Sequence, residues 1–173
     1  NVQKNLDPVL IYDYRNDLRK RSKAISNYII IYAYTGRLNR KEEHYIKEFA
    51  RRRKKKIVSI GYFSSIADLN IICNPLEVFD YFSNADYIIT DTFHGTIFSI
   101  KTHSKFCTII RNSNNNKLVD LLSTLKRTDR IATNLEEIDL LYEREIDYAP
   151  TDEIIEEERN KTMDYLREKI IIE

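Results

Sequence analysis

The sequence contains few residues that interrupt regular secondary structure, with three glycines and three prolines among 173 residues. It has no tryptophan, one methionine and two cysteines, Cys73 and Cys107. Two cysteines argue against a disulfide framework of the kind that small secreted domains use. Each cysteine neighbours an apolar run, so we expect reduced thiols packed in the core. The scarcity of glycine and proline favours helices and strands joined by polar turns.

Neither sign of charge is in excess, because 28 basic and 27 acidic residues give a formal net charge of +1. This balance gives no overall attraction to nucleic acid or to a membrane. A basic run from Arg51 to Lys56 closes a predicted helix, and we interpret it as a solvated helix end whose cations suit the helix dipole. Attraction of an acidic polymer or a membrane surface is the alternative interpretation.

Long apolar runs are also missing, since none approaches the roughly 20 residues that a membrane-spanning helix needs. The first residues lack the pattern of a signal peptide and an initiator methionine. These features suggest an excised domain or a processed product. We expect a cytoplasmic location, provided that no preceding segment carries a signal, and leave open peripheral membrane association of a full-length protein.

Apolar periodicity predicts alternating strands and helices after a charge-rich leading segment, 1–23. Asp7-Pro8 is expected to be turn-like, with 9–12 a short strand or an extended linker. We expect a loop at 62–70 and a possible edge contact at Ile131. Strands are predicted at 28–34, 57–60, 86–90 and 106–110, and helices at 39–52, 74–84, 93–102, 117–125, 135–141 and 151–170. Residues 24–173 then form a single Rossmann-like α/β domain with a mostly parallel sheet and helices on both faces.

The stretch from Ala85 to Ile100 combines a buried strand, a polar turn and the start of a helix. Ligands of open α/β sheets bind at the carboxyl ends of strands, and a helix N-terminus favours an anion. His94 stands at this point and is the strongest candidate for general acid chemistry or for support of negative charge. Asp91 either orients His94 or caps the turn, and the second interpretation is slightly favoured. Thr90, Thr92 and Thr96 offer hydroxyls to a phosphate, and Gly95 keeps the backbone approachable.

The same stretch resembles the hallmark segment of the polysaccharide pyruvyl transferase family, a strand followed by Ser/Thr-Asp-x-x-His-Gly. The Thr-Asp-Thr-Phe-His-Gly version looks like a bacterial branch. The resemblance runs from about Asp7 to Arg130 and includes these segments: Asp7-Pro8-Val9-Leu10, Tyr28 to Ala33, Asn74-Pro75-Leu76-Glu77, His94-Gly95, Lys105-Phe106 and Arg111. It implies the carboxyl-terminal half of a two-domain, GT-B-like enzyme, with a separate amino-terminal domain missing from this chain.

In that family the donor is phosphoenolpyruvate, and the motif histidine contributes to donor binding or catalysis. The resemblance therefore implies pyruvyl transfer to a sugar hydroxyl of a surface polysaccharide or its precursor, forming a ketal, with no cofactor. Many members carry an arginine two residues before the histidine, where this chain has Thr92. Another cation would then have to hold the donor, and Arg37, Arg111 and Lys117 near the predicted strand ends are the candidates.

Two other function classes stay open. One is a GT-B-like glycosyltransferase that uses a nucleotide sugar at the same edge of the sheet, and the other is a non-catalytic sugar-assembly or binding domain, which Thr92 favours. His44 and His103 are expected at the surface, and the histidines have no metal-ligand spacing with the cysteines, so no metal site is predicted. No glycine-rich phosphate loop or nucleic-acid motif is present.

Overall fold

The chain forms one parallel sheet in the computed structural model, which describes residues 5–14 and 25–169. The strands lie in the order β3-β2-β1-β4-β5-β6, and every neighbouring pair is parallel. They are β1 (Tyr28–Tyr32), β2 (Lys56–Ile60), β3 (Leu69–Ile71), β4 (Tyr87–Thr90), β5 (Phe106–Ile109) and β6 (Ile131–Ala132). The sheet grows outward in one direction from β1 and in the other from β4, so β1 and β4 flank the topological switch point where ligands of such folds bind.

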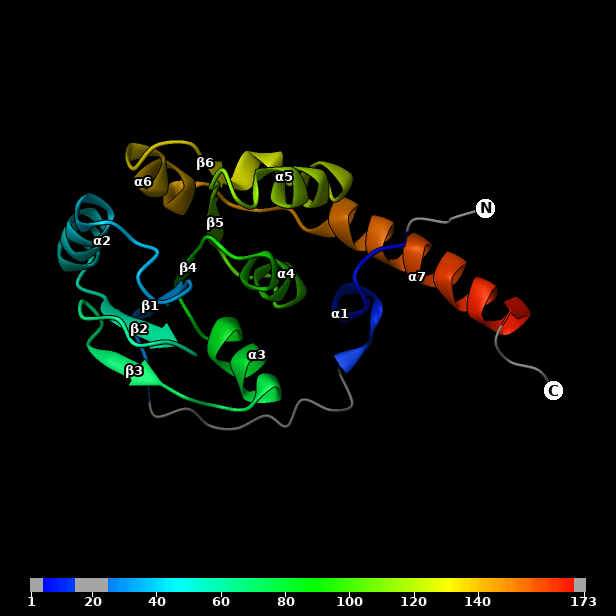
Figure 1. Cartoon of the computed structure of the whole chain (residues 1–173), viewed down its shortest axis with the longest axis horizontal. Coiled ribbons are helices and arrows are strands. Elements are labelled where there is room, and N and C mark those ends of the chain that lie inside the picture. Colours follow the sequence, from blue (N-terminus) through cyan, green and yellow to red (C-terminus); the bar gives the residue numbers. More distant parts are fainter. Residues whose placement is uncertain (1–4, 15–24, 170–173) are drawn as a thin grey trace.

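Helices cover both faces of the sheet (Figure 1). They are α1 (Pro8–Ile11), α2 (Arg40–Arg52), α3 (Pro75–Ser83), α4 (Phe93–Lys101), α5 (Asn115–Thr124), α6 (Glu136–Glu143) and α7 (Ala149–Lys169). Side chains alternate along the central strands, so Ile30 and Ile88 pack with α1, α3, α4 and α5, while Ile29 and Ile89 pack with α2 and α6. The two buried clusters fix the strands and therefore the place where each strand ends.

The structure confirms the mostly parallel Rossmann-like sheet and the α/β order that the sequence predicts. The start of α3 also follows the predicted pattern. The Asn74 side chain accepts a hydrogen bond from the Glu77 N–H (3.0 Å), and the Glu77 carboxylate accepts one from the Asn74 N–H (3.1 Å). With Pro75 in the first helical position, these residues form a capping box.

Two predictions about secondary structure were wrong. Residues 9–12 were expected to be extended, but they lie in and just after α1, because the Asp7 side chain caps the Val9 N–H (2.9 Å) and Pro8 suits a first helical turn. The expected loop at 62–70 ends in β3, a short edge strand that pairs with β2. The charge-rich residues 15–23 lie outside the described residues.

The basic run at the end of α2 is largely exposed, as expected, but Arg53 and Lys55 are partly buried. The Arg53 guanidinium lies over the rings of Phe49 (4.6 Å) and Tyr142 (4.5 Å) and pairs with Asp139 of α6 (3.0 Å). Arg52 pairs with the same carboxylate (2.7 Å). These contacts tie the end of α2 to α6.

The cysteines are free thiols, as the sequence predicts, although Cys73 is only partly buried. Burial raises the pKa of the Cys107 thiol to about 12, so it remains protonated at neutral pH. His44 is exposed, and His103 stacks on Tyr148 and contacts Asp152 (2.9 Å). None of the helices within residues 5–14 and 25–169 has the length and apolar character needed to cross a membrane.

Candidate functional site

The turn after β4 is held by its own hydroxyl groups. Thr90 Oγ1 donates to the Tyr32 carbonyl at the end of β1 (2.7 Å) and accepts from the Thr92 N–H (3.1 Å). Thr92 is the N-cap of α4, and its hydroxyl accepts from the Gly95 N–H (2.9 Å). The helix cap that the sequence interpretation slightly favoured for Asp91 therefore belongs to Thr92.

His94 lies in the first turn of α4 with its side chain 53% exposed. Its ring borders a cavity of about 200 Å³ together with residues from the ends of β1, β2 and β4: Tyr32, Ala33, Tyr34, Thr35, Ile60, Gly61, Tyr62 and Thr92. The cavity lies at the carboxyl edge of the sheet beside a helix N-terminus, where unpaired N–H groups favour an anion. An accessible imidazole therefore lies where a small charged ligand is expected to bind.

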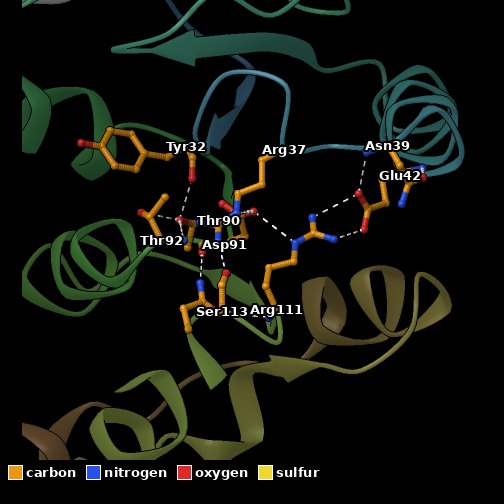
Figure 2. A network of polar contacts seen from close by, with 10 residues as sticks. Tyr32, Arg37, Asn39, Glu42, Thr90, Asp91, Thr92, Arg111 and Ser113 are labelled. Atoms are coloured by element: carbon orange, nitrogen blue, oxygen red, sulfur yellow. Dashed lines mark hydrogen bonds and ion pairs between the residues drawn. The ribbon is translucent and has the colours of Figure 1, made fainter. Parts of the chain in front are cut away.

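Asp91 points into a network of charged side chains on the other side of the turn (Figure 2). Its Oδ2 accepts a hydrogen bond from Arg111 Nε (3.1 Å). The other two nitrogens of Arg111 donate to the two oxygens of Glu42 (2.5 and 3.1 Å), and Glu42 also accepts from the Asn39 N–H at the start of α2 (2.8 Å). Arg111 therefore ties the ends of β4 and β5 to the beginning of α2.

Arg37 joins this network from the loop after β1. Its Nε lies 3.6 Å from Asp91 Oδ2, and its terminal nitrogen donates to the Ser113 hydroxyl. The Arg37 guanidinium also lies over the Tyr34 ring, which borders the cavity (5.3 Å). Asn114 fixes the opposite side of the turn by donating to the Asp91 carbonyl (2.6 Å). Two guanidinium groups thus share one carboxylate; neither arginine is among the residues that line the cavity, although Tyr34, which Arg37 covers, is one of them.

Burial raises the pKa of the Asp91 carboxyl above its ordinary value, although the guanidinium of Arg111 opposes this shift. Asp91 Oδ1 is also buried, and it finds no hydrogen-bond partner among the described residues. The contacts of Asp91 are thus with Arg37 and Arg111. A different acidic residue, Asp7, lies beside the His94 ring, with its Oδ2 4.0 Å from Nε2. Sequence reasoning missed Asp7 and Glu42 at this edge. For Asp7 the available signal was an Asp-Pro pair, which also starts helices.

Three further residues of the expected ligand-binding set also lie outside the lining of the cavity. The Thr96 hydroxyl is fully buried and contacts the Thr92 carbonyl and the Thr108 hydroxyl (both 3.0 Å), so it is not available to a ligand. Lys117 is exposed on α5 and does not border the cavity. Gly95 is required by packing, because a Cβ there would lie 2.7 Å from both Thr92 Oγ1 and Tyr32 Cδ1, and even nearer to Thr90 Oγ1.

We expect Gly95→Ala to lower the free energy of unfolding by about 1–3 kcal/mol, the cost of overpacking a filled site. A loss of stability would be informative, because helix propensity alone predicts a gain: alanine is favoured over glycine by about 1 kcal/mol in a helix interior. Chemical denaturation monitored by circular dichroism measures the change. A more stable variant would show that the backbone and Tyr32 move apart without cost.

Among residues 5–14 and 25–169, no group of three or more His, Cys, Asp or Glu side chains is arranged to hold a metal ion. The side chains at this edge include an imidazole, hydroxyl groups, tyrosine rings, carboxylates and paired arginines. Such groups can bind an anion and can transfer a proton to or from it.

The sheet order and the polar cluster at its switch point define a Rossmann-like domain of the GT-B-like type. The sequence pattern of the polysaccharide pyruvyl transferase family matches residues 1–114, which is more than half of the chain. The chain belongs to that family. A search of curated proteins found no match to this sequence.

Solved structures support the assignment of the fold. An O-GlcNAc transferase mutant from Thermobaculum terrenum is similar with a TM-score of 0.53 and 12% sequence identity, over 95% of this chain and 35% of that chain. The glycotransferase of kitacinnamycin is similar with a TM-score of 0.51 and 11% identity, over 87% of this chain and 45% of that chain. The chain thus spans less than half the length of either structure, and at such identities the likeness concerns the fold alone.

Proposed function

We propose that this domain binds phosphoenolpyruvate in the cavity beside His94 and takes part in pyruvyl transfer to a sugar of a surface polysaccharide or its precursor. The observation that carries the proposal is the accessible imidazole at the N-terminus of α4, bordering a cavity of about 200 Å³ at the switch point. Pockets for drug-sized ligands measure about 300–1,000 Å³. A three-carbon acid phosphate suits the smaller volume better than a nucleotide sugar does.

The proposed reaction needs a proton donor and a site for negative charge. One sugar hydroxyl adds to C2 of phosphoenolpyruvate while C3 gains a proton and becomes a methyl group. A second hydroxyl of the sugar then displaces phosphate from C2, which completes the ketal, and both hydroxyl protons are released. In this scheme His94 gives its proton to C3, and the N-terminus of α4 faces the anionic groups of the donor.

Arg37 is the cation that we assign to the donor in place of the arginine that Thr92 replaces. All three nitrogens of Arg111 are engaged by Asp91 and Glu42, and its side chain is 19% exposed. Arg37 is 24% exposed, and its looser contact with Asp91 leaves donor capacity for a carboxylate or a phosphate. Arg111 supports Asp91 in this proposal, while Thr90, Thr92 and Gly95 shape the turn that presents His94.

The acceptor sugar, in this proposal, lies in a cleft between this domain and a further domain of the same cytoplasmic protein. Two alternatives make different demands on the cavity. A glycosyltransferase would bind a nucleotide sugar there, and a non-catalytic domain would bind neither donor. Thr92, which supplies no positive charge, is the feature that favours the non-catalytic alternative.

Isothermal titration calorimetry of the chain tests the proposal with phosphoenolpyruvate, a nucleotide sugar and inorganic phosphate as ligands. We expect phosphoenolpyruvate to bind more tightly than phosphate, and His94→Gln to weaken its binding at least tenfold. His44→Gln is the matched control, because His44 is an exposed residue of α2 outside the cavity lining. Preferential binding of the nucleotide sugar, or no binding of either donor, would overturn the proposal in favour of the corresponding alternative.

A further inference from the structure

The short helix α1 is anchored at both ends beside α4. At its C-terminal end, Lys101 Nζ of α4 donates to the carbonyls of Leu10 (2.9 Å) and Tyr12 (2.8 Å). Leu10 is fully buried in the core cluster that includes α4. Because α1 lies along α4, its first residues reach the end of α4 that carries His94. The leading segment thus brings a side chain to the functional edge of the sheet.

That side chain is Asp7, whose two carboxylate oxygens have different surroundings. Oδ1 accepts from the Val9 N–H (2.9 Å) and caps α1. Oδ2 lies 4.0 Å from His94 Nε2, and the Asp7 side chain is largely covered, with 23% of it exposed. The helix cap fixes the carboxylate, so the second oxygen is held toward the imidazole and is not free to turn away.

The remaining described neighbours of the His94 ring include two aromatic rings. Phe93 and Phe98 flank it, with ring centroids 5.7 and 6.1 Å away. Phenyl rings limit the movement of the imidazole but accept no ordinary hydrogen bond from it. Asp91, the carboxylate expected from sequence to serve His94, is engaged by Arg111 (3.1 Å).

We propose that Asp7 is the positioning residue of His94: it orients the imidazole at the mouth of the donor cavity and selects Nε2 as the nitrogen that carries the proton of the neutral ring. The separation of 4.0 Å exceeds a hydrogen bond, and catalytic contacts are often this long before substrate binds. A carboxylate accepts but does not donate hydrogen bonds, so it favours a ring whose Nε2–H faces it. The role of the pair in pyruvyl transfer rests on the proposed function, whereas the coupling of Asp7 to His94 does not.

Asp7→Asn tests this coupling without removing the helix cap, since asparagine caps a helix as well as aspartate does. The amide oxygen must face the Val9 N–H to keep the cap, which turns the amide nitrogen, a donor, toward His94. Native His94 should carry its proton on Nε2 when neutral, and the variant should shift that proton to Nδ1. Long-range ¹H–¹⁵N NMR spectra of the imidazole distinguish these two tautomers.

A second variant, Asp7→Ser, also keeps the cap and simply removes the group that faces His94. It should give a mixture of tautomers, and circular dichroism should show that both variants fold. Unchanged imidazole signals in both variants would overturn the proposal and leave Asp7 as a helix cap only. Calorimetry gives an independent result. We expect the Asp7→Asn variant to bind phosphoenolpyruvate at least fivefold more weakly than the native protein does. If the tautomer shifts but native protein binds no phosphoenolpyruvate, the Asp7–His94 coupling stands and the proposed function fails.

Discussion

Replacing Arg111 with methionine should lower the free energy of unfolding by about 3 kcal/mol, because it removes one partner from a largely buried set of ion pairs. Arg111 is the hydrogen-bond donor that links Asp91 to both oxygens of Glu42. Methionine preserves most of the apolar stem but leaves two carboxylates facing each other without this cation. Urea denaturation followed by circular dichroism measures the loss.

A matched control is Arg51→Met on the surface of α2. Arg51 also makes two hydrogen bonds to a carboxylate, that of Glu48, but its side chain is 71% exposed. Water and salt screen such a pair, so the control should leave stability nearly unchanged. Equal losses in the two variants would show that the network beneath the site contributes no more than an ordinary surface pair.

The stability deficit of Arg111→Met should also depend on pH. Burial raises the pKa of the Asp91 carboxyl, and Arg111 is the group that most strongly opposes this rise. Without Arg111 the folded-state pKa rises further, so the folded variant binds a proton more readily than the unfolded chain does. The stability of the variant should therefore fall as pH rises above the ordinary pKa of an aspartate, about 4, and the deficit relative to the native protein should narrow as pH is lowered toward that value. A deficit independent of pH would assign the loss to packing.

The parts of the fold that depend on local pattern could be predicted from the sequence. The apolar run before Thr90 indicated a buried parallel strand, and Asn74-Pro75 with Glu77 indicated a capped helix; both are present. Strand β3 was missed because its three residues include only one apolar side chain on each side of Asn70, too short a pattern to separate from a loop. Its pairing with β2 is a tertiary interaction that no local signal reports.

In the candidate site, too, local pattern predicts some features and not others. The position of His94 at a strand-to-helix turn follows from periodicity and sheet topology. The partners of charged side chains do not, because Arg111 meets Glu42 across 69 residues of sequence. The sequence placed Asp7 in a leading segment before a strand or linker at 9–12. Neither of these expectations predicts that Asp7 lies near His94. The contact between Asp7 and His94 depends on the packing of α1 against α4. This packing is a long-range interaction that cannot be recognised in a single sequence.

Removing the imidazole should have the largest effect on turnover. In a protein that contains this chain and is active in pyruvyl transfer, we expect His94→Ala to lower kcat by about 10²- to 10⁴-fold, the usual contribution of a positioned proton donor. Phosphate release from phosphoenolpyruvate in the presence of a polysaccharide acceptor measures the rate. His44→Ala, which removes an exposed imidazole from α2, should leave that rate unchanged.

His94→Lys separates the two roles of the ring. Lysine keeps a positive charge near the cavity but holds its proton too tightly to act as an efficient acid at neutral pH. If His94 gives its proton to C3 of the donor, the lysine variant should recover KM for phosphoenolpyruvate while kcat stays low. Recovery of both constants would restrict His94 to electrostatic support, and unchanged kcat in His94→Ala would remove it from the reaction altogether.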